Sequence, residues 1–168
     1  MSKFSWSLTQ VGWFMGTIAA SAAIMLAFYP VWLIVMLMTV LVVHELGHYG
    51  AAKLLNDKAF LPAFIPLVFL VLGATWIPTK DPEHIRVISM AGPMLGLAVS
   101  VAMCIAFLLL SSPTGAWFAG GMALREVIAA TFGSDGRKFR KAKEKNNTVI
   151  NFSTISVPYD IHADWGIK

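Results

Sequence analysis

The chain alternates between long apolar stretches and short polar connections. The apolar stretches cover residues 8–28, 31–55, 62–79, 87–110 and 115–132, and a polar segment, residues 133–168, follows them. A helix that crosses a bilayer needs about 20 mostly apolar residues. The first, second, fourth and fifth stretches meet this requirement, so we expect each of them to be a membrane-spanning helix.

The third stretch differs from the others because it contains Pro62, Pro66, Gly73 and Pro78 among β-branched and aromatic residues. Proline breaks a helix, since it lacks the N–H donor and clashes with the preceding turn. We interpret this stretch as a membrane-embedded re-entrant loop with strand character, which other parts of the protein must cover. A kinked fifth spanning helix is the alternative.

Charge placement favours the re-entrant loop over the fifth span. With four spans, the basic tail lies on one side of the membrane together with Lys3, Lys53, Lys58, Lys80 and Arg86. The connections on the opposite side, residues 29–30 and 111–114, carry no charge. This distribution follows the positive-inside rule and predicts that both termini are cytosolic.

Composition supports an integral membrane protein. Hydrophobic residues make up 57% and charged residues 13% of the 168 residues, whereas a soluble domain has about 25% charged residues. These values exclude an ordinary soluble domain, a disordered chain and a collagen-like repeat. The single cysteine, Cys104, excludes an intramolecular disulfide framework and a multi-cysteine metal site. The net charge of +4 is explained by topology and by contact with membrane lipid, so it requires no nucleic acid.

Candidate chemistry lies in the second stretch, which contains His44-Glu45-Leu46-Gly47-His48. Residues four apart share one face of a helix, so both imidazoles can bind one Zn²⁺ ion per chain. Glu45 can then act as the general base on a zinc-bound water. His44 lies about 20 Å along the helix from Val31, which places the metal inside the bilayer, where ionisable groups indicate function.

A catalytic zinc site needs a third protein ligand. The metzincin spacing would place it at position 54, which is Leu54, so that class is excluded. The remaining donors are Asp57, Asp81, Glu83, His84, Glu126, Asp135, Asp160, His162 and Asp164. Asp135 precedes Gly136 and is also typical of a plain Asp-Gly turn, while His84 and Asp57 are expected to be surface loop and turn residues.

Together these features resemble the site-2 protease (M50) family of intramembrane zinc metalloproteases. The HELGH motif, the embedded segment at 64–74, Ala91-Gly92-Pro93 opening a span and Asp135-Gly136 in a later span follow the family's order over residues 31–137. The resemblance implies a core of three helices in which His44, His48 and Asp135 hold the zinc. The chain lacks the Asn- and Pro-rich stretch that usually precedes the last motif.

Arg125 and Glu126 interrupt the fifth stretch, where charge is costly. One interpretation is an ion pair, between them or with another helix. The other makes Glu126 the hydrogen-bond partner of a zinc histidine and Arg125 the stabiliser of an oxyanion. One continuous helix would turn Glu126 away from Asp135, and a break at Gly133 would remove that constraint.

We therefore expect an all-α membrane protein with about four transmembrane helices, a β-like re-entrant loop and a site-2-protease-like core. Its parts are an N-terminal transmembrane helix, a zinc-protease core and a basic cytosolic tail, at residues 1–30, 31–137 and 138–168. Within the tail, residues 146–168 are either an ordinary tail or a strand that docks near the active site. The compact form suggests a prokaryotic inner membrane.

The expected function is regulated intramembrane proteolysis: hydrolysis of peptide bonds in or near transmembrane segments of a single-pass membrane protein. A substrate helix must unwind first, and Phe64, Gly73 and Ala74 are candidates for binding it as an added strand. Two alternatives remain open. One is a catalytically inactive, zinc-binding membrane scaffold, and the other is a membrane-anchored zincin that cleaves cytosolic peptides.

Overall fold

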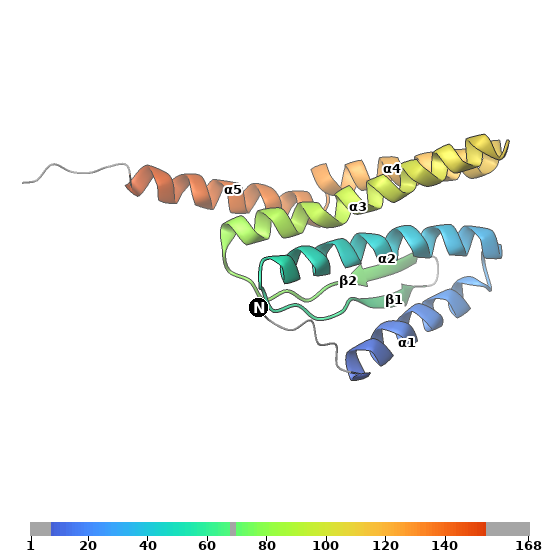
Figure 1. Ribbon diagram of the computed structural model, residues 1–168, viewed down its shortest axis with the longest axis horizontal. Helices are drawn as coiled ribbons and strands as arrows, with labels where there is room; N and C mark the ends of the chain where they lie inside the picture. Colours follow the sequence, from blue (N-terminus) through green and yellow to red (C-terminus); the bar gives the residue numbers. More distant parts are fainter. Residues whose placement is uncertain (1–7, 68–69, 154–168) are drawn as a thin grey trace, which may run out of the picture.

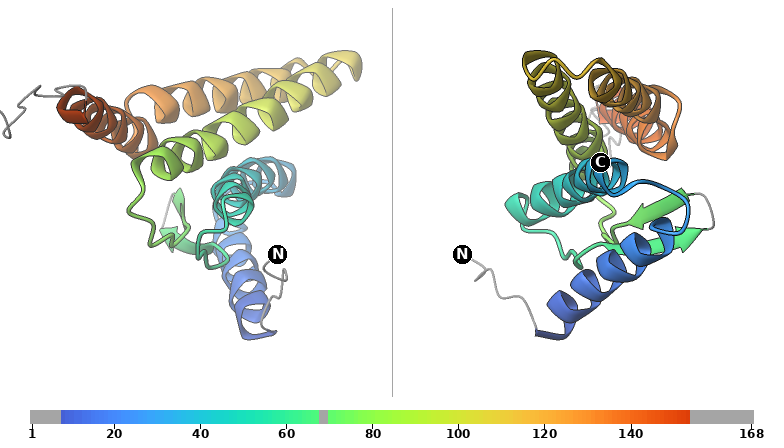
Figure 2. Two further views of the ribbon diagram at one scale, coloured as in Figure 1. Left: turned by 60° about the vertical axis from the view of Figure 1, so that its left-hand side comes forward. Right: turned by 90° about the vertical axis from the view of Figure 1, so that its right-hand side faces the viewer.

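The computed structural model describes residues 8–67 and 70–153, which form helices and one β-hairpin (Figure 1). In chain order the elements are α1 (Leu8–Met25), α2 (Val31–Leu54), β1 (Ala63–Leu67), β2 (Leu70–Ala74), α3 (Pro82–Leu109), α4 (Pro113–Thr131) and α5 (Ser134–Ser153). The views agree that α2 lies between the α3–α4 pair on one side and the hairpin on the other, with α1 beyond the hairpin (Figures 1 and 2).

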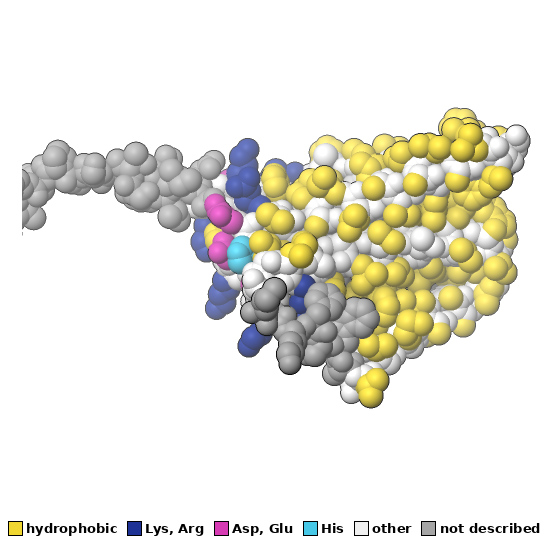
Figure 3. All heavy atoms as spheres, viewed as in Figure 1, with side chains coloured by type: hydrophobic (Ala, Val, Ile, Leu, Met, Phe, Trp, Pro, Cys, Tyr) yellow, Lys and Arg dark blue, Asp and Glu magenta, His cyan; other side chains and the backbone are white. Residues whose placement is uncertain are grey.

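Three helices, α1, α2 and α3, are long and apolar enough to cross a membrane. The fourth expected span corresponds to α4, which carries Arg125 and Glu126 and does not belong to this set. Apolar side chains are spread over the visible face of the helical body (Figure 3). Trp13 and Trp117 are among the exposed apolar residues. The expectation of a mostly helical chain is therefore confirmed, and its three long apolar helices are consistent with a membrane protein.

The start of α3 corrects one sequence-based expectation. The Asp81 side chain accepts a hydrogen bond from the Glu83 backbone N–H at 2.8 Å, and Pro82 occupies the first turn. Both features favour a helix start, so α3 begins five residues before the apolar stretch that starts at Val87. The Ala91-Gly92-Pro93 segment consequently lies inside the helix and does not open it.

The proline-containing stretch forms an antiparallel hairpin, in which Phe64 pairs with Gly73 and Ile65 with Leu72. Its strand character is confirmed, and the alternative of a kinked spanning helix is wrong for these strands. Phe64 is 1% exposed and packs against Phe14 of α1 with ring centroids 6.0 Å apart.

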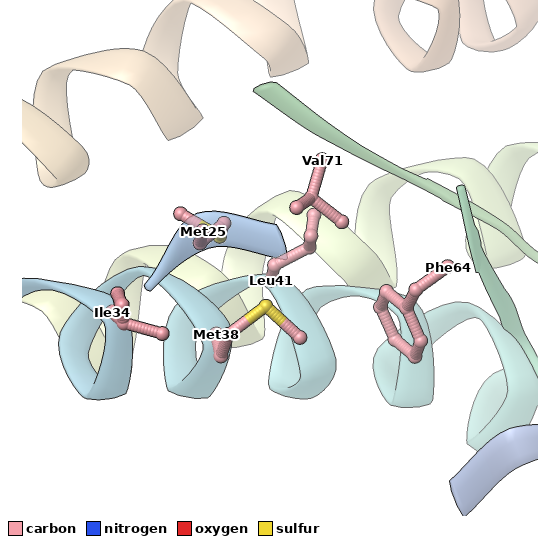
Figure 4. Packing of buried hydrophobic residues seen from close by; sticks show 6 residues of the cluster. All are labelled: Met25, Ile34, Met38, Leu41, Phe64 and Val71. Carbon is pink, nitrogen blue, oxygen red and sulfur yellow. The ribbon is translucent and has the colours of Figure 1, made fainter. Parts of the chain in front are cut away.

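The main apolar cluster fixes this hairpin to the helices. Figure 4 shows its members, which come from α1, α2 and both strands: Met25, Ile34, Met38, Leu41, Phe64 and Val71. A second cluster joins α2 to α4 through Leu33, Met36, Val40, Ala119 and Met122. Helix α2 thus packs on both sides, which accounts for its buried middle and places its polar motif in the interior.

The polar C-terminal segment is helical where the structure describes it. Helix α5 continues to Ser153, so the interpretation of residues 146–153 as a strand is wrong, and residues 154–168 lie outside the described part. Side chains of α5 contact both preceding helices. The Arg86 guanidinium of α3 lies 5.5 Å from the ring centroid of Phe139, and Arg140 donates a hydrogen bond to the Thr131 carbonyl of α4. Helix α5 therefore begins against the core.

Candidate metal centre

Helix α2 places the HELGH side chains in the protein interior. His44, Glu45 and His48 are each less than 9% exposed. The two imidazoles lie one turn apart on the same helix face, and their Nε2 atoms are 3.2 Å apart. The spacing predicted from the helical period is therefore confirmed.

Asp135 joins the two histidines from a different helix. Its Oδ2 atom lies 3.5 Å from Nε2 of His44 and 3.5 Å from Nε2 of His48. The sequence placed Asp135 at the end of the fifth apolar stretch, but α4 ends at Thr131 and Asp135 belongs to the first turn of α5. The two helices are interrupted at Gly133, where a Cβ atom would lie 2.6 Å from the Ala129 carbonyl oxygen.

The geometry of these three side chains fits a zinc ion. Tetrahedral ligands at about 2.0–2.1 Å from zinc lie about 3.3 Å from one another. The three separations here, 3.2, 3.5 and 3.5 Å, are close to that value. His44, His48 and Asp135 form the group of potential metal ligands found among the described residues.

The partners of the two Nδ1 atoms determine which ring nitrogen of each histidine is free to bind a metal. His48 Nδ1 lies 2.7 Å from the Ile88 carbonyl oxygen, which can only accept, so this nitrogen donates its proton there. His44 Nδ1 lies 2.6 Å from Oε2 of Glu126 and donates to that carboxylate. Both Nε2 atoms then point lone pairs at the Asp135 carboxylate, and a positive charge, a metal ion or a proton, must lie between them.

Asp135 itself supplies negative charge to the site. Burial alone would raise the pKa of its carboxyl group, but the facing imidazoles of His44 and His48 outweigh burial and hold the pKa below its usual range. The carboxylate is therefore ionised at neutral pH, as a zinc ligand must be.

The ion pair between Arg125 and Glu126 is confirmed, and Glu126 also contacts His44, while the oxyanion role of Arg125 stays a prediction. The fully buried Glu126 carboxylate accepts from His44 through Oε2 and from the Arg125 guanidinium through Oε1. Gly96 of α3 leaves room for it, since a Cβ atom there would lie 2.9 Å from Oε2 of Glu126. Because α4 and α5 are separate helices, Glu126 and Asp135 reach His44 from different directions.

Glu45 lies against the hairpin. Its Oε2 atom accepts a hydrogen bond from Thr75 Oγ1 at 2.7 Å. A cavity of about 600 Å³ opens beside it. Its lining includes the end of β2 and the residue that follows it, together with side chains from α2, α4 and α5: Gly73, Ala74, Thr75, His44, Glu45, His48, Arg125 and Asp135. Two of the candidate substrate-binding residues, Gly73 and Ala74, therefore line the cavity, whereas Phe64 lies in the apolar cluster away from it.

The other candidate ligands lie elsewhere. His84 is not a loop residue but belongs to the first turn of α3, where its Nδ1 atom lies 2.9 Å from Oδ2 of Asp57. This pair connects the turn after α2 to the start of α3. Asp160, His162 and Asp164 lie outside the described residues.

Sequence reasoning missed Thr75. Thr75 follows a strand whose register determines what this residue faces, and the one available signal in the sequence is a hydroxyl side chain within an apolar stretch.

Comparison with known proteins gives no match: no family model, no curated protein and no solved structure is similar to this chain. Its function is therefore inferred from the residues and geometry of the site.

Proposed function

We propose that this protein is an intramembrane zinc metalloprotease of the site-2 protease type, which cleaves single-pass membrane proteins in or near their transmembrane segments. One observation carries the proposal. Two histidine nitrogens from α2, a helix long and apolar enough to cross a membrane, lie within 3.5 Å of an aspartate oxygen from α5, and Glu45 lines the same cavity.

His44, His48 and Asp135 would hold the zinc. When bound, it would supply Lewis acidity, polarising a water molecule and the carbonyl of the peptide bond to be cleaved. Glu45 takes the proton from the attacking water and then delivers it to the nitrogen of the leaving amine. The proton thus moves from water to amine through a single carboxylate: the C–O bond forms first, and the C–N bond breaks once its nitrogen has taken up the proton.

Arg125 and Glu126 support this chemistry from α4. Glu126 accepts from His44 Nδ1 and so holds Nε2 toward the metal position. The Arg125 side chain is 52% exposed and lines the cavity, where its guanidinium can stabilise negative charge on the carbonyl oxygen. The ion pair between the two residues also lowers the cost of burying charge in α4, which we propose as a fourth span.

The hairpin offers a place for the substrate. Within the described residues the sheet consists of β1 and β2, so β2 has one paired edge, and its end lines the cavity through Gly73 and Ala74. An unwound substrate segment could pair with β2 and place its carbonyl near the metal. We propose that the hairpin is a re-entrant element covered by α1 and α2, and that both termini are cytosolic in a prokaryotic inner membrane.

Cleavage in lipid vesicles tests the proposal. Zinc-loaded protein would be reconstituted with a panel of single-pass membrane proteins, and the products sized by mass spectrometry. We expect cleavage within or beside the transmembrane segment, and a loss of at least about 100-fold in Glu45→Gln at unchanged zinc content. Glu144→Gln, on the exposed face of α5, is the matched control and should retain full activity.

The same experiment, together with a comparison of the wild type and Glu45→Gln in cells, separates the alternatives. If Glu45→Gln keeps the biological effect of the wild type and neither protein cleaves the panel, the zinc-binding scaffold replaces the protease. If soluble casein is cleaved and the membrane panel is not, the protein is a membrane-anchored zincin that acts on cytosolic peptides.

A further inference from the structure

We infer that Thr75 is a positioning residue that holds the Glu45 carboxylate, so that the orientation of the general base is set by the end of strand β2. This inference deepens the proposed function and rests on it, because it concerns the base of the same site. Thr75 is not expected to contact the substrate bond or the metal; it acts through Glu45.

The contact between Thr75 and Glu45 joins two distant parts of the chain. Thr75 directly follows β2, and its Oγ1 atom lies 2.7 Å from Oε2 of Glu45 and 3.2 Å from the Glu45 backbone oxygen. The Glu45 residue is 7% exposed, so a carboxylate that loses this donor has little water to replace it. The hydroxyl therefore stabilises one orientation of the carboxylate.

The backbone of β2 confines the same carboxylate from a second direction. A Cβ atom at Gly73 would lie 2.6 Å from Oε1 and 2.7 Å from Cδ of Glu45. The carboxylate thus lies directly against the strand, which accommodates it because position 73 has no side chain. Thr75 binds Oε2 and Gly73 leaves space for Oε1, which remains available to take a proton.

This arrangement couples base and substrate through one element. Strand β2 ends in the residues that line the cavity, and the same end holds Glu45. A shift of β2 would therefore move the base together with the proposed docking edge. A misplacement of about 1 Å in a catalytic group can cost about 100-fold in rate, so the hydroxyl is expected to affect the chemical step more than substrate binding.

Substitutions at Thr75 test the inference in the zinc-loaded, full-length protein. Thr75→Val keeps the shape and removes the donor, and we expect kcat to fall about 10- to 100-fold with KM and zinc content unchanged. Thr75→Ser keeps the donor and should restore kcat to near the wild-type value. Thr39→Val is the matched control: it removes a hydroxyl bond of 2.7 Å to the Val35 carbonyl, also on α2, and should leave kcat unchanged.

A second measurement does not depend on cleavage. The visible absorption spectrum of the cobalt-loaded protein reports the ligands and the groups beside the open coordination position. We expect Thr75→Val to shift this spectrum in the direction of Glu45→Ala, and Thr75→Ser and Thr39→Val to match the wild type.

The outcomes distinguish the inference from the proposed function. Wild-type kcat and a wild-type cobalt spectrum in Thr75→Val would overturn the role of Thr75 and leave the protease intact. If the zinc-loaded wild type cleaves nothing, the proposed function fails, and the cobalt spectrum alone decides whether Thr75 holds Glu45. Loss of zinc in Thr75→Val would indicate a structural role and would also overturn the inference.

Discussion

Each histidine of the centre uses both of its ring nitrogens. The Nε2 atoms face Asp135, and the Nδ1 atoms donate to fixed acceptors, Glu126 for His44 and the Ile88 carbonyl for His48. These outer bonds select the tautomer and orient the rings before any ion binds. The site therefore includes the acceptors behind the two histidines. The role of each ligand, and that of Glu126, can be tested by a single substitution.

The metal content of purified protein tests the ligand set directly. We expect about one zinc per chain in the wild type, and loss of zinc in His44→Ala and in Asp135→Ala, because two ligands do not hold the ion. His84→Ala serves as the control: His84 is paired with Asp57, away from the centre, and its loss should leave the zinc in place. Zinc retained in Asp135→Ala but lost in His44→Ala would assign the third position to another residue.

Replacement of Glu126 by glutamine tests the bond behind His44. The amide oxygen can still accept from Nδ1, but the negative charge that makes the imidazole a stronger ligand is lost. We expect zinc affinity to fall about 10- to 100-fold, measured by competition with a chelator of known affinity. An unchanged affinity would make the carboxylate only the partner of Arg125.

The sequence predicts these residues unequally, for physical reasons. His44, Glu45 and His48 follow from the helical period alone, because their neighbourhood is local. Asp135 could be predicted only by resemblance, since its position depends on the interruption between α4 and α5 at Gly133 and on the packing of α5. Thr75 could not be predicted at all, because a contact across 30 residues depends on strand register.

At the scale of elements, α2 and α3 approach closely through glycines. A Cβ atom at Gly47 of α2 would lie 2.7 Å from the Ala91 carbonyl oxygen and 3.0 Å from the Gly92 Cα atom of α3. A Cβ atom at Gly92 would in turn collide with the His48 imidazole. The helix contact and the metal centre therefore share the same small residues.

Gly92→Ala tests this dependence. The added methyl group has backbone on one side and the His48 ring on the other, so we expect the ring to move and most of the zinc to be lost. Gly50→Ala is the matched control, because a Cβ atom at Gly50 meets nothing within 4 Å. Zinc content and melting temperature measure both effects, and full zinc content in Gly92→Ala would show that α3 yields without disturbing His48.

The elements themselves were predictable where the pattern was long. Helix α2 begins and ends within one residue of its apolar stretch, and the proline-containing stretch forms strands. The early start of α3 and the helix α5 were missed. In α5 the many charged residues leave no long apolar pattern that would predict a helix. Its buried face is short: Phe139 contacts Arg86, and Ala142 is buried. The helix therefore depends on tertiary contacts.

At the scale of the whole molecule, apolar surface and charge separate. Lysine and arginine side chains gather at one end of the apolar body, beside the start of α5 (Figure 3). This is the end where α2 finishes and α3 begins (Figure 1). By the positive-inside rule, the topology that we propose puts this end in the cytosol. The connection between α3 and α4, at the opposite end, is uncharged.

Cysteine labelling tests this orientation and the role of α4. In a Cys104→Ser background, which has no other cysteine, we expect Thr114→Cys to react with a membrane-impermeant reagent only from outside the cell. Lys141→Cys should react only in inverted vesicles. Both residues are exposed, and both variants should react in detergent. Labelling of both positions from one side would mean that α4 does not cross the membrane.

The break at Gly133 has a consequence for biosynthesis. Because Asp135 belongs to the last described helix, a growing chain that has inserted α1 to α4 still lacks one side of the centre. The three potential ligands can therefore meet only after the ribosome has released the start of α5. If the proposed function holds, peptide hydrolysis would therefore begin only after α5 has been synthesised.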